Sequence, residues 1–237
     1  MWFKSTDTQD RWADAMKHLR RDPVMRQIIK QVGPCTLVPR RDYFVKLVQS
    51  ILSQQVSVAA AASMFRKLSE AMPGKKVTPT NVLTFLTTKD DETIRSVGLS
   101  RQKRAYVHDL ATKFLDGTIK HRQFAKMDDE TLIEHLTQIK GIGRWTVEML
   151  LIFAMNRTDV WPVDDLGIQE SYRIQFKLKE RPKPKELAPL ADKWKPWRTV
   201  ASWYLWRVRH PAPVAAKSRT ASRKTKSKPD AKTKRPV

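Results

Sequence analysis

Apolar residues recur at steps of three and four along residues 42–72, which is the period of an amphipathic helix. The polar run Ser53-Gln54-Gln55 interrupts this apolar face, and Pro73-Gly74 follows its end. The apolar positions are Phe44, Leu47, Val48, Ile51, Leu52, Val56, Ala59 and Ala60. We therefore expect two helices with a break at residues 53–55 and a stop after the second helix.

Turn signals are scarce in the rest of the chain, which has only 7 glycines in 237 residues. A β-sandwich or barrel usually needs more glycine at its turns, so we expect an all-α fold. Helices are expected at residues 1–22, from a start at residues 161–165, and at residues 196–208 after a Pro- and Lys-rich connection at 181–185. The residues expected at other helix starts are Thr78, Asp90, Ser100 and Asp128.

Basic residues dominate the chain, because 46 Lys and Arg against 24 Asp and Glu give a net charge of +22. Residues 211–237 carry +8 of this charge, and the remaining body carries +14. A body this basic attracts polyanions such as DNA or RNA; the alternative is a basic protein without such a partner. The composition of residues 211–237 predicts a disordered tail that adds salt-sensitive affinity for phosphates or has no role.

Cys35 is the only cysteine, which excludes an internal disulfide and any four-cysteine zinc or iron–sulfur site. No apolar run reaches the ~18 residues of a membrane span, and no signal peptide opens the chain. We expect an intracellular protein without a membrane partner, in the cytoplasm or nucleoid of a bacterium or in the nucleus of a eukaryote.

The run Gly141-Ile142-Gly143 joins two expected helices. Glycines allow a tight turn, and the free amides at the start of the second helix can bind a phosphate without reading its base. Ile142 is expected to pack inward and hold the two helices together. The alternative is an ordinary helix–helix turn, but the basic body and the carboxylates that follow favour the phosphate-binding hairpin.

Four motifs in order resemble the helix-hairpin-helix DNA glycosylase superfamily. Residues 136–146 match its hairpin, and Val163-Asp164-Asp165-Leu166 matches its loop and aspartate. Residues 51–57 and 194–198 resemble the alkylbase branch, 3-methyladenine DNA glycosylase II. The resemblance implies an all-α helix-hairpin-helix glycosylase domain at residues 1–210, with the hairpin at about 130–155 and two helical lobes flanking an active-site cleft. Too little chain precedes Asp42 for the extra β domain of the bacterial enzyme.

The resemblance makes Asp165 the catalytic carboxylate, which stabilises positive charge on deoxyribose and orients or deprotonates water. Asp164 is then expected to be a helix cap or support, although adjacent acids at a helix start are usually both caps. Relatives that cleave the strand have a lysine where this chain has Trp145. An indole cannot form a Schiff base, so we expect a monofunctional glycosylase that leaves an abasic site.

The resemblance also assigns the residues that contact DNA. Trp145 and Trp206 are expected to line the base pocket, and Gln55, with Gln54 beside it, to fill the gap left by the flipped base. The alternatives are core tryptophans and solvated glutamines on a kinked helix. Glu148 and Met149 stand where the bacterial β-domain enzyme has another aromatic, which leaves the preferred base open. The hairpin residues expected to bind phosphate are Gly141, Gly143, Arg144 and Thr146.

The implied function is the excision of alkylated purines, such as 3-methyladenine and 7-methylguanine, from double-stranded DNA, which starts base excision repair. We expect a monomer with no required cofactor and no metal-ligating side chains; hairpin carbonyls could hold a monovalent cation, as in relatives. Three alternatives stay open: a glycosylase for oxidised or deaminated bases, a non-enzymatic hairpin DNA-binding protein, and a bifunctional lyase.

Overall fold

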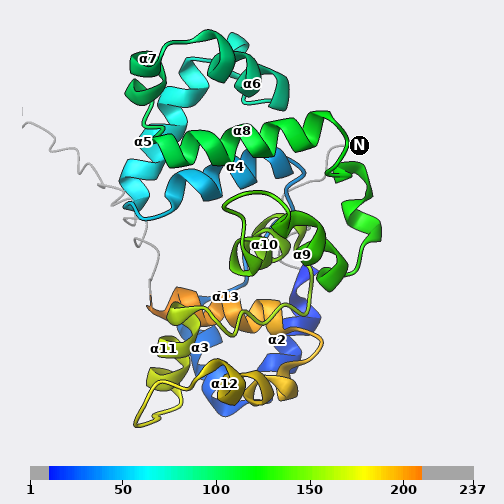
Figure 1. Cartoon of the computed structure of the whole chain (residues 1–237). Coiled ribbons are helices and arrows are strands. Elements are labelled where there is room, and N and C mark those ends of the chain that lie inside the picture. Colours follow the sequence, from blue (N-terminus) through cyan, green and yellow to red (C-terminus); the bar gives the residue numbers. More distant parts are fainter. Residues whose placement is uncertain (1–10, 210–237) are drawn as a thin grey trace, which may run out of the picture.

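The computed structural model describes residues 11–209, which form helices and connecting loops with no strand in this range (Figure 1). The expected all-α fold is confirmed. Two separate hydrophobic cores divide the described chain into two lobes, and the partly buried Trp206 packs against both. Within the part of the expected leading helix that the structure describes, residues Ala13–Leu19 form helix α2. The expected tail at 211–237 lies outside the described residues.

The first lobe contains the two helices expected from residues 42–72, together with the hairpin. Its core is built from leucine, isoleucine, valine and phenylalanine side chains that are almost fully buried. The helices of this lobe are α4 (Tyr43–Ser53), α5 (Val58–Glu70), α6 (Pro79–Thr88), α7 (Asp91–Ser96), α8 (Arg101–Leu115), α9 (Asp129–Thr137) and α10 (Arg144–Leu150), with short 3-10 turns at Pro73–Lys75 and His121–Lys126.

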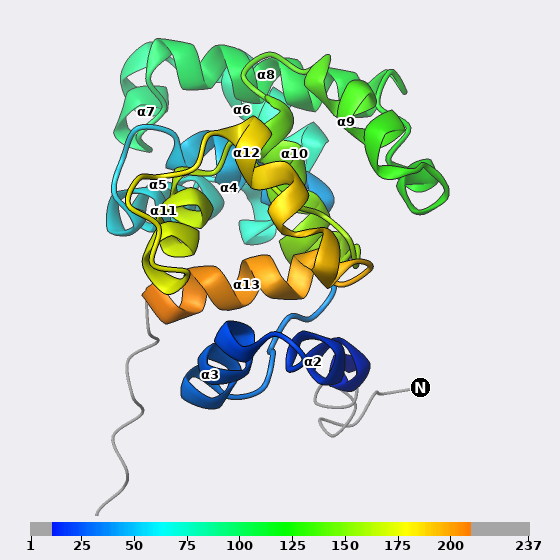
Figure 2. The same ribbon diagram turned by 90° about the horizontal axis from the view of Figure 1, so that it is seen from below.

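The second lobe combines both ends of the described chain. Its last helix, α13, lies against α2 and α3 from the start of the chain and against α11 (Figure 2). The core here is rich in tryptophan and tyrosine, including Trp12, Trp194 and Tyr204. The helices of this lobe are α2 (Ala13–Leu19), α3 (Pro23–Val32), α11 (Leu166–Gln175), α12 (Pro184–Leu190) and α13 (Arg198–Arg209), with a 3-10 turn at Asp192–Trp194.

The expected break between α4 and α5 is confirmed. Gln55 has a φ of 59°, a left-handed conformation that cannot continue a helix. Ser57 then caps α5, because its hydroxyl accepts a hydrogen bond from the amide of Ala60 at 3.2 Å. The helix caps expected elsewhere are confirmed as well. In each case the side chain of the capping residue accepts a hydrogen bond from the amide three residues later; the capping residues are Thr78, Asp90, Ser100 and Asp128.

The Pro- and Lys-rich connection at 181–185 is shorter than expected, because α12 begins inside it at Pro184. Proline suits the first turn of a helix, where its missing amide has no partner to lose. Glu186 completes the start by accepting a hydrogen bond from the amide of Lys183 at 2.8 Å. The charged, proline-rich composition of this segment predicted a connection, whereas its last two residues begin a helix.

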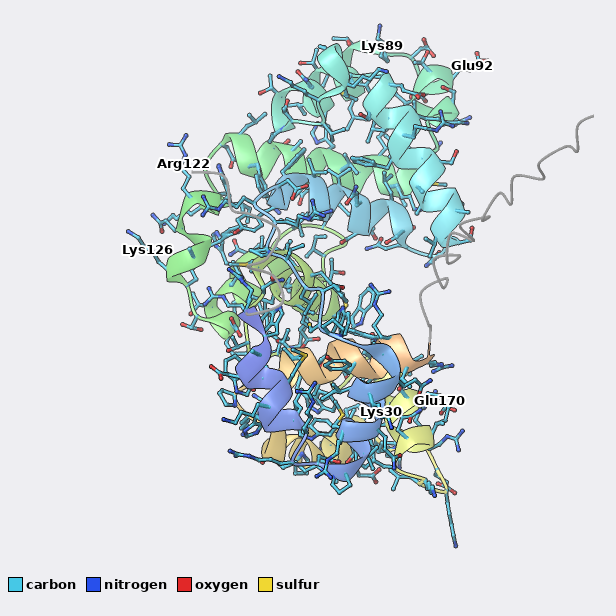
Figure 3. The ribbon with its side chains drawn as sticks, turned by 180° about the vertical axis from the view of Figure 1, so that it is seen from behind. Lys30, Lys89, Glu92, Arg122, Lys126 and Glu170 are labelled. Atoms are coloured by element: carbon cyan, nitrogen blue, oxygen red, sulfur yellow. The ribbon has the colours of Figure 1, made fainter. Side chains whose placement is uncertain are left out.

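Basic side chains lie on the outside of both lobes. Lys30 belongs to the second lobe, and Lys89, Arg122 and Lys126 belong to the first; all four are exposed and project outward (Figure 3). The positive charge of the body is thus available at its surface. None of the helices described is both long and apolar enough to cross a membrane.

Candidate active site

Asp165 begins helix α11 at the junction of the two lobes. Its Oδ1 accepts a hydrogen bond from the amide of Ile168 at 2.7 Å, so Asp165 is itself the N-cap of the helix. The expectation that Asp164 caps this helix is wrong: Asp164 is exposed, whereas Asp165 is only 7% exposed. The loop turns before Asp165, whose amide donates to the carbonyl of Pro162 at 3.1 Å.

Two indole N–H groups from two different helices donate hydrogen bonds to the Asp165 carboxylate. Trp145 Nε1, on α10, donates to Oδ2 at 2.7 Å, and Trp206 Nε1, on α13, donates to Oδ1 at 3.0 Å. An ionised carboxylate offers acceptors at both oxygens, which suits three N–H donors. Within residues 11–209, no lysine, arginine or histidine forms an ion pair with Asp165. The charge is thus oriented but not neutralised.

Gly167 allows this close packing. A Cβ atom at this position would lie 2.9 Å from Asp165 Oδ1 and 3.3 Å from Trp206 Nε1. Any side chain here would therefore displace the carboxylate or the indole. Sequence reasoning missed Gly167; the available signal was a glycine in the first turn of a helix, two residues after the candidate catalytic acid.

A pocket of about 360 Å³ opens in front of the carboxylate. Trp145 is 47% exposed and Trp206 is partly buried, and the structure brings both to this pocket beside Asp165. The remaining residues that line it are Met149, Phe153, Trp203 and Arg207. The walls are therefore mainly aromatic, with one carboxylate and one guanidinium.

Sequence reasoning missed Phe153, Trp203 and Arg207. Phe153 packs against Trp206 with ring centroids 5.2 Å apart, and the Arg207 guanidinium lies 5.3 Å from the centre of the Trp203 ring. Phe153 follows Met149 by four residues, which was an available signal for a shared helix face. The segment Leu151–Met155 is a π-helix, however, so the helical register changes just where Phe153 reaches the pocket.

The hairpin turn depends on its first glycine. Gly141 has a φ of +80°, and a Cβ atom there would lie 2.2 Å from Cδ2 of Tyr106 on α8. Ile142 is buried, as expected, and Gln54 Nε2 donates to the carbonyl of Gly141 at 2.8 Å. The hairpin is thus fixed by a close approach to α8 and by the loop that separates α4 from α5.

The exposed Gly143 is the N-cap of α10 and has no side chain, so no cap side chain binds the first amides of this helix. Arg144 is also exposed, and its guanidinium forms two hydrogen bonds with Glu130, one of them at 3.0 Å. The Thr146 side chain is buried, so only its amide, and not its hydroxyl, can contribute to a phosphate site. Phosphate binding by this turn stays a prediction.

Gln54 and Gln55 have different environments in the loop between α4 and α5. Gln54 is partly buried and is held by its hydrogen bond to the hairpin. Gln55 is exposed and forms no side-chain hydrogen bond with the described residues. Gln55 is therefore free to enter a duplex, whereas Gln54 supports the loop; the wedge role of this pair stays a prediction.

Glu148, one turn after Arg144, is a buried acid beside the site. The pKa of its carboxyl is raised to about 7, mainly by burial; the charge of Arg144 opposes this shift and that of Asp164 adds to it. Arg144 Nη1 lies 3.7 Å from Glu148 Oε1, and Oε2 is buried without a hydrogen-bond partner. A group that titrates near neutrality thus lies one turn after Arg144.

The structure offers little to a metal or cation. Within the described range, no group of three or more His, Cys, Asp or Glu side chains could hold a metal ion. Three hairpin carbonyls already accept hydrogen bonds: that of Gln138 from Lys113, that of Ile139 from Ile142, and that of Gly141 from Gln54. Only their second lone pairs are available to a monovalent cation, and no step below depends on one.

The fold and these motifs have close counterparts among known proteins. Residues 48–196 match the model of the HhH-GPD superfamily of base excision DNA repair proteins. The chain belongs to this superfamily. The matched residues include the loop with Gln54 and Gln55, the hairpin and the Asp165 turn. The match also contains Trp145 and Asp165, which line the pocket of this HhH-GPD protein.

Two relatives from Schizosaccharomyces pombe cover most of this HhH-GPD chain. The alkylbase DNA glycosidase-like protein mag2 is 35% identical over 82% of the chain and 92% of its own length. DNA-3-methyladenine glycosylase 1 is 36% identical over 79% of the chain and 82% of its own length. Among solved structures, the S. pombe 3-methyladenine DNA glycosylase Mag1 in complex with abasic DNA aligns with a TM-score of 0.73 and 34% identity, covering 82% of this chain and 96% of Mag1.

Proposed function

We propose that this chain is a monofunctional DNA glycosylase that flips an alkylated purine out of duplex DNA and hydrolyses its N-glycosidic bond. The observation that carries the proposal is the Asp165 carboxylate, which has no cationic partner in the described range and faces an aromatic pocket between two indole donors. The names of the two S. pombe relatives support alkylated bases as the substrate class.

The reaction needs a negative charge beside the sugar. When the bond from C1′ to the base nitrogen breaks, its electron pair leaves with the base and positive charge develops on deoxyribose. Asp165 stabilises this charge, and a water oxygen then bonds to C1′ while its proton passes to the carboxylate and on to solvent. The products are a free base and an abasic site.

The aromatic pocket selects the leaving group. Purines alkylated at N3 or N7 carry positive charge, which normal bases lack, and they leave as neutral molecules. The faces of Trp145, Trp206 and Phe153 attract such a cation by up to ~2 kcal/mol when water is excluded. The pocket therefore favours charged lesions over normal bases.

The start of α10, Gln55 and the basic surface bind the DNA. The amides that follow the exposed Gly143 at the start of α10 bind a backbone phosphate, and the exposed Gln55 fills the gap that the flipped base leaves in the stack. The basic surface adds affinity that falls as salt is raised. We propose that the protein acts inside the cell on duplex DNA as a monomer and needs no cofactor.

The test is the product formed from methylated duplex DNA. The proposal predicts that 3-methyladenine and 7-methylguanine are released as free bases while the strand stays intact until the abasic site is cleaved by heat or alkali. Borohydride should trap no covalent adduct, because Trp145 occupies the position at which strand-cleaving relatives have a lysine. Release of only oxidised or deaminated bases from a lesion panel would contradict the proposal.

A further inference from the structure

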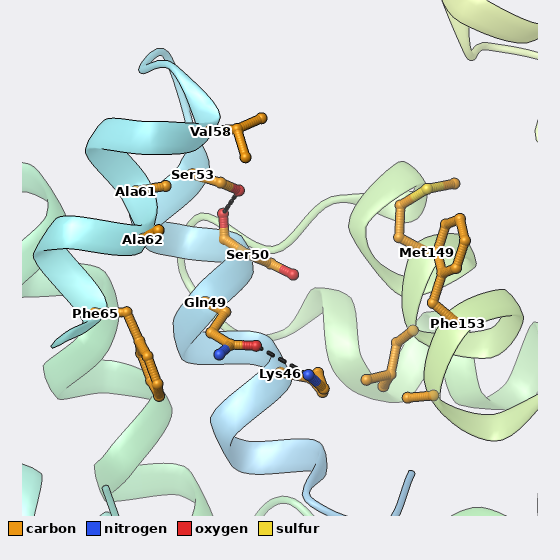
Figure 4. A pocket seen from close by; sticks show the side chains of 12 residues that line it. Lys46, Gln49, Ser50, Ser53, Val58, Ala61, Ala62, Phe65, Met149 and Phe153 are labelled. Atoms are coloured by element: carbon orange, nitrogen blue, oxygen red, sulfur yellow. Dashed lines mark hydrogen bonds between the residues drawn. The ribbon is translucent and has the colours of Figure 1, made fainter. Parts of the chain in front are cut away.

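A second cavity adjoins the base pocket and has no part in the mechanism above. It is a groove of about 460 Å³ between α4 and α5 on one side and α10 with the following π-helix on the other (Figure 4). We call it the side groove. The residues that line it are Lys46, Gln49, Ser50, Ser53, Val58, Ala61, Ala62, Phe65, Met149, Leu150, Phe153 and Ala154.

The side groove and the base pocket share two walls. Met149 and Phe153 line both cavities, while Asp165, Trp203 and Trp206 line only the base pocket. A purine seated in front of Asp165 would therefore contact the same two side chains that open onto the groove. The two cavities are therefore neighbours, separated by Met149 and Phe153.

The chemistry of the groove suits a neutral apolar group. Lys46 Nζ donates to Gln49 Oε1 at 3.1 Å, and Ser53 Oγ donates to the carbonyl of Ser50 at 2.8 Å, so part of the polar lining is already hydrogen-bonded within the groove. The Lys46 ammonium also disfavours a second cation at this end of the groove. The other walls are alkyl or aromatic, and Val58 is 88% exposed.

Small side chains keep the groove open. Ala61 and Ala62 face it from α5, and Ser50 and Ser53 face it from α4, where larger residues would fill the space (Figure 4). A methyl substituent on the purine is too short to occupy a cavity of this volume. A longer alkyl or aralkyl chain would bury apolar surface there, which is favourable.

We propose that the side groove binds the N-alkyl substituent of lesions larger than a methyl adduct, so that the enzyme excises bulkier alkylpurines as well. This inference rests on the proposed function of the base pocket and adds the substrate class that the neighbouring groove admits. The purine stays between the aromatic walls in front of Asp165, and only its substituent enters the groove.

The experiment compares two lesions that differ only in the substituent, N7-methylguanine and N7-benzylguanine in the same duplex. Both modified bases carry the same positive charge, and the same N-glycosidic bond is broken in each. The groove-filling variant is Ala62→Phe, at an exposed helix position where a phenylalanine can be accommodated without entering the core. The matched control is Ala59→Phe, at an exposed alanine of the same helix that does not line the groove.

We expect the wild-type protein to release both bases. Ala62→Phe should lower single-turnover release of benzylguanine by about tenfold or more, the effect of blocking an apolar subsite, and leave methylguanine release unchanged. Ala59→Phe should leave both rates unchanged. Because methylguanine release reports on the folded enzyme in every variant, loss of folding is distinguished from loss of the groove.

Two results would overturn the inference and leave the proposed function intact. One is a wild-type protein that releases methylguanine but not benzylguanine. The other is an Ala62→Phe variant that slows both lesions equally, or neither. Failure of the wild-type protein to release methylguanine at all would instead count against the proposed function.

Discussion

The indole nitrogen of Trp145 lies 2.7 Å from Oδ2 of Asp165, across the gap between α10 and α11. This hydrogen bond joins the residue that follows Arg144 in α10 to the carboxylate that we propose as catalytic. The hairpin proposed to bind phosphate and the proposed catalytic charge are thus connected through α10.

Trp145→Phe keeps an aromatic wall but removes the donor to Asp165. Because the carboxylate is then oriented only by Trp206 and the amide of Ile168, we expect the single-turnover rate to fall by about tenfold to a hundredfold. DNA affinity should change little. Single-turnover base release and fluorescence-anisotropy binding check this; an unchanged rate would mean that the indole only lines the pocket.

Gly167→Ala places a methyl group 2.9 Å from Asp165 Oδ1. The carboxylate must move by several tenths of an ångström, so we expect excision to fall by about tenfold or more while the protein stays folded. Base-release rates together with thermal unfolding check this. Wild-type activity in a stable Gly167→Ala protein would show that the carboxylate position tolerates displacement.

Gly141→Ala should destabilise the fold by about 2 kcal/mol or more, because its Cβ meets the Tyr106 ring and its φ is +80°. In a Tyr106→Ala background, which lacks the ring, Gly141→Ala should lower the free energy of unfolding by only about 1 kcal/mol. This remainder comes from the left-handed backbone conformation alone. Urea unfolding of the four proteins measures this coupling. Equal costs in both backgrounds would show that the close approach to α8 carries no strain.

Glu148 should make the protein less stable as pH rises. Its folded-state pKa of about 7 is above the unfolded value of 4.5, so the unfolded chain ionises first. Below pH 4.5 both states are protonated and the penalty is absent; it grows as pH rises toward 7 and reaches about 3 kcal/mol above that.

Glu148→Gln removes this titration, so the difference in the free energy of unfolding between variant and wild type should shift in favour of the variant between pH 5 and pH 8. Urea unfolding at both pH values measures this. A difference that stays constant across this range would contradict a raised pKa for the buried carboxyl.

Local signals were sufficient for much of the fold. The break at Gln55, the caps at Thr78 and Asp128, and the inward-facing Ile142 follow from turn chemistry and apolar period, which act over a few residues. The two indoles and Asp165 were identified through resemblance, and the structure brings all three together.

The rest depends on contacts between distant segments. Asp164 and Asp165 are adjacent acids in the sequence, and the second one faces inward, where two indoles from distant helices bind it. Phe153 reaches the pocket through a π-helix, and Trp203 and Arg207 reach it through the packing of α13 against α11. Neither the irregular register nor the packing of the two lobes has a signature in a single sequence.

The central claim is that the Asp165 charge drives excision, and Asp165→Asn under single-turnover conditions tests it most directly. Asparagine keeps the shape, loses the charge and turns an N–H₂ group toward one of the two indole donors. We predict that release of 3-methyladenine from methylated duplex DNA is lost, while affinity for the same duplex, measured by anisotropy, is kept or raised. An Asp165→Asn protein that releases the base at the wild-type rate would contradict the mechanism.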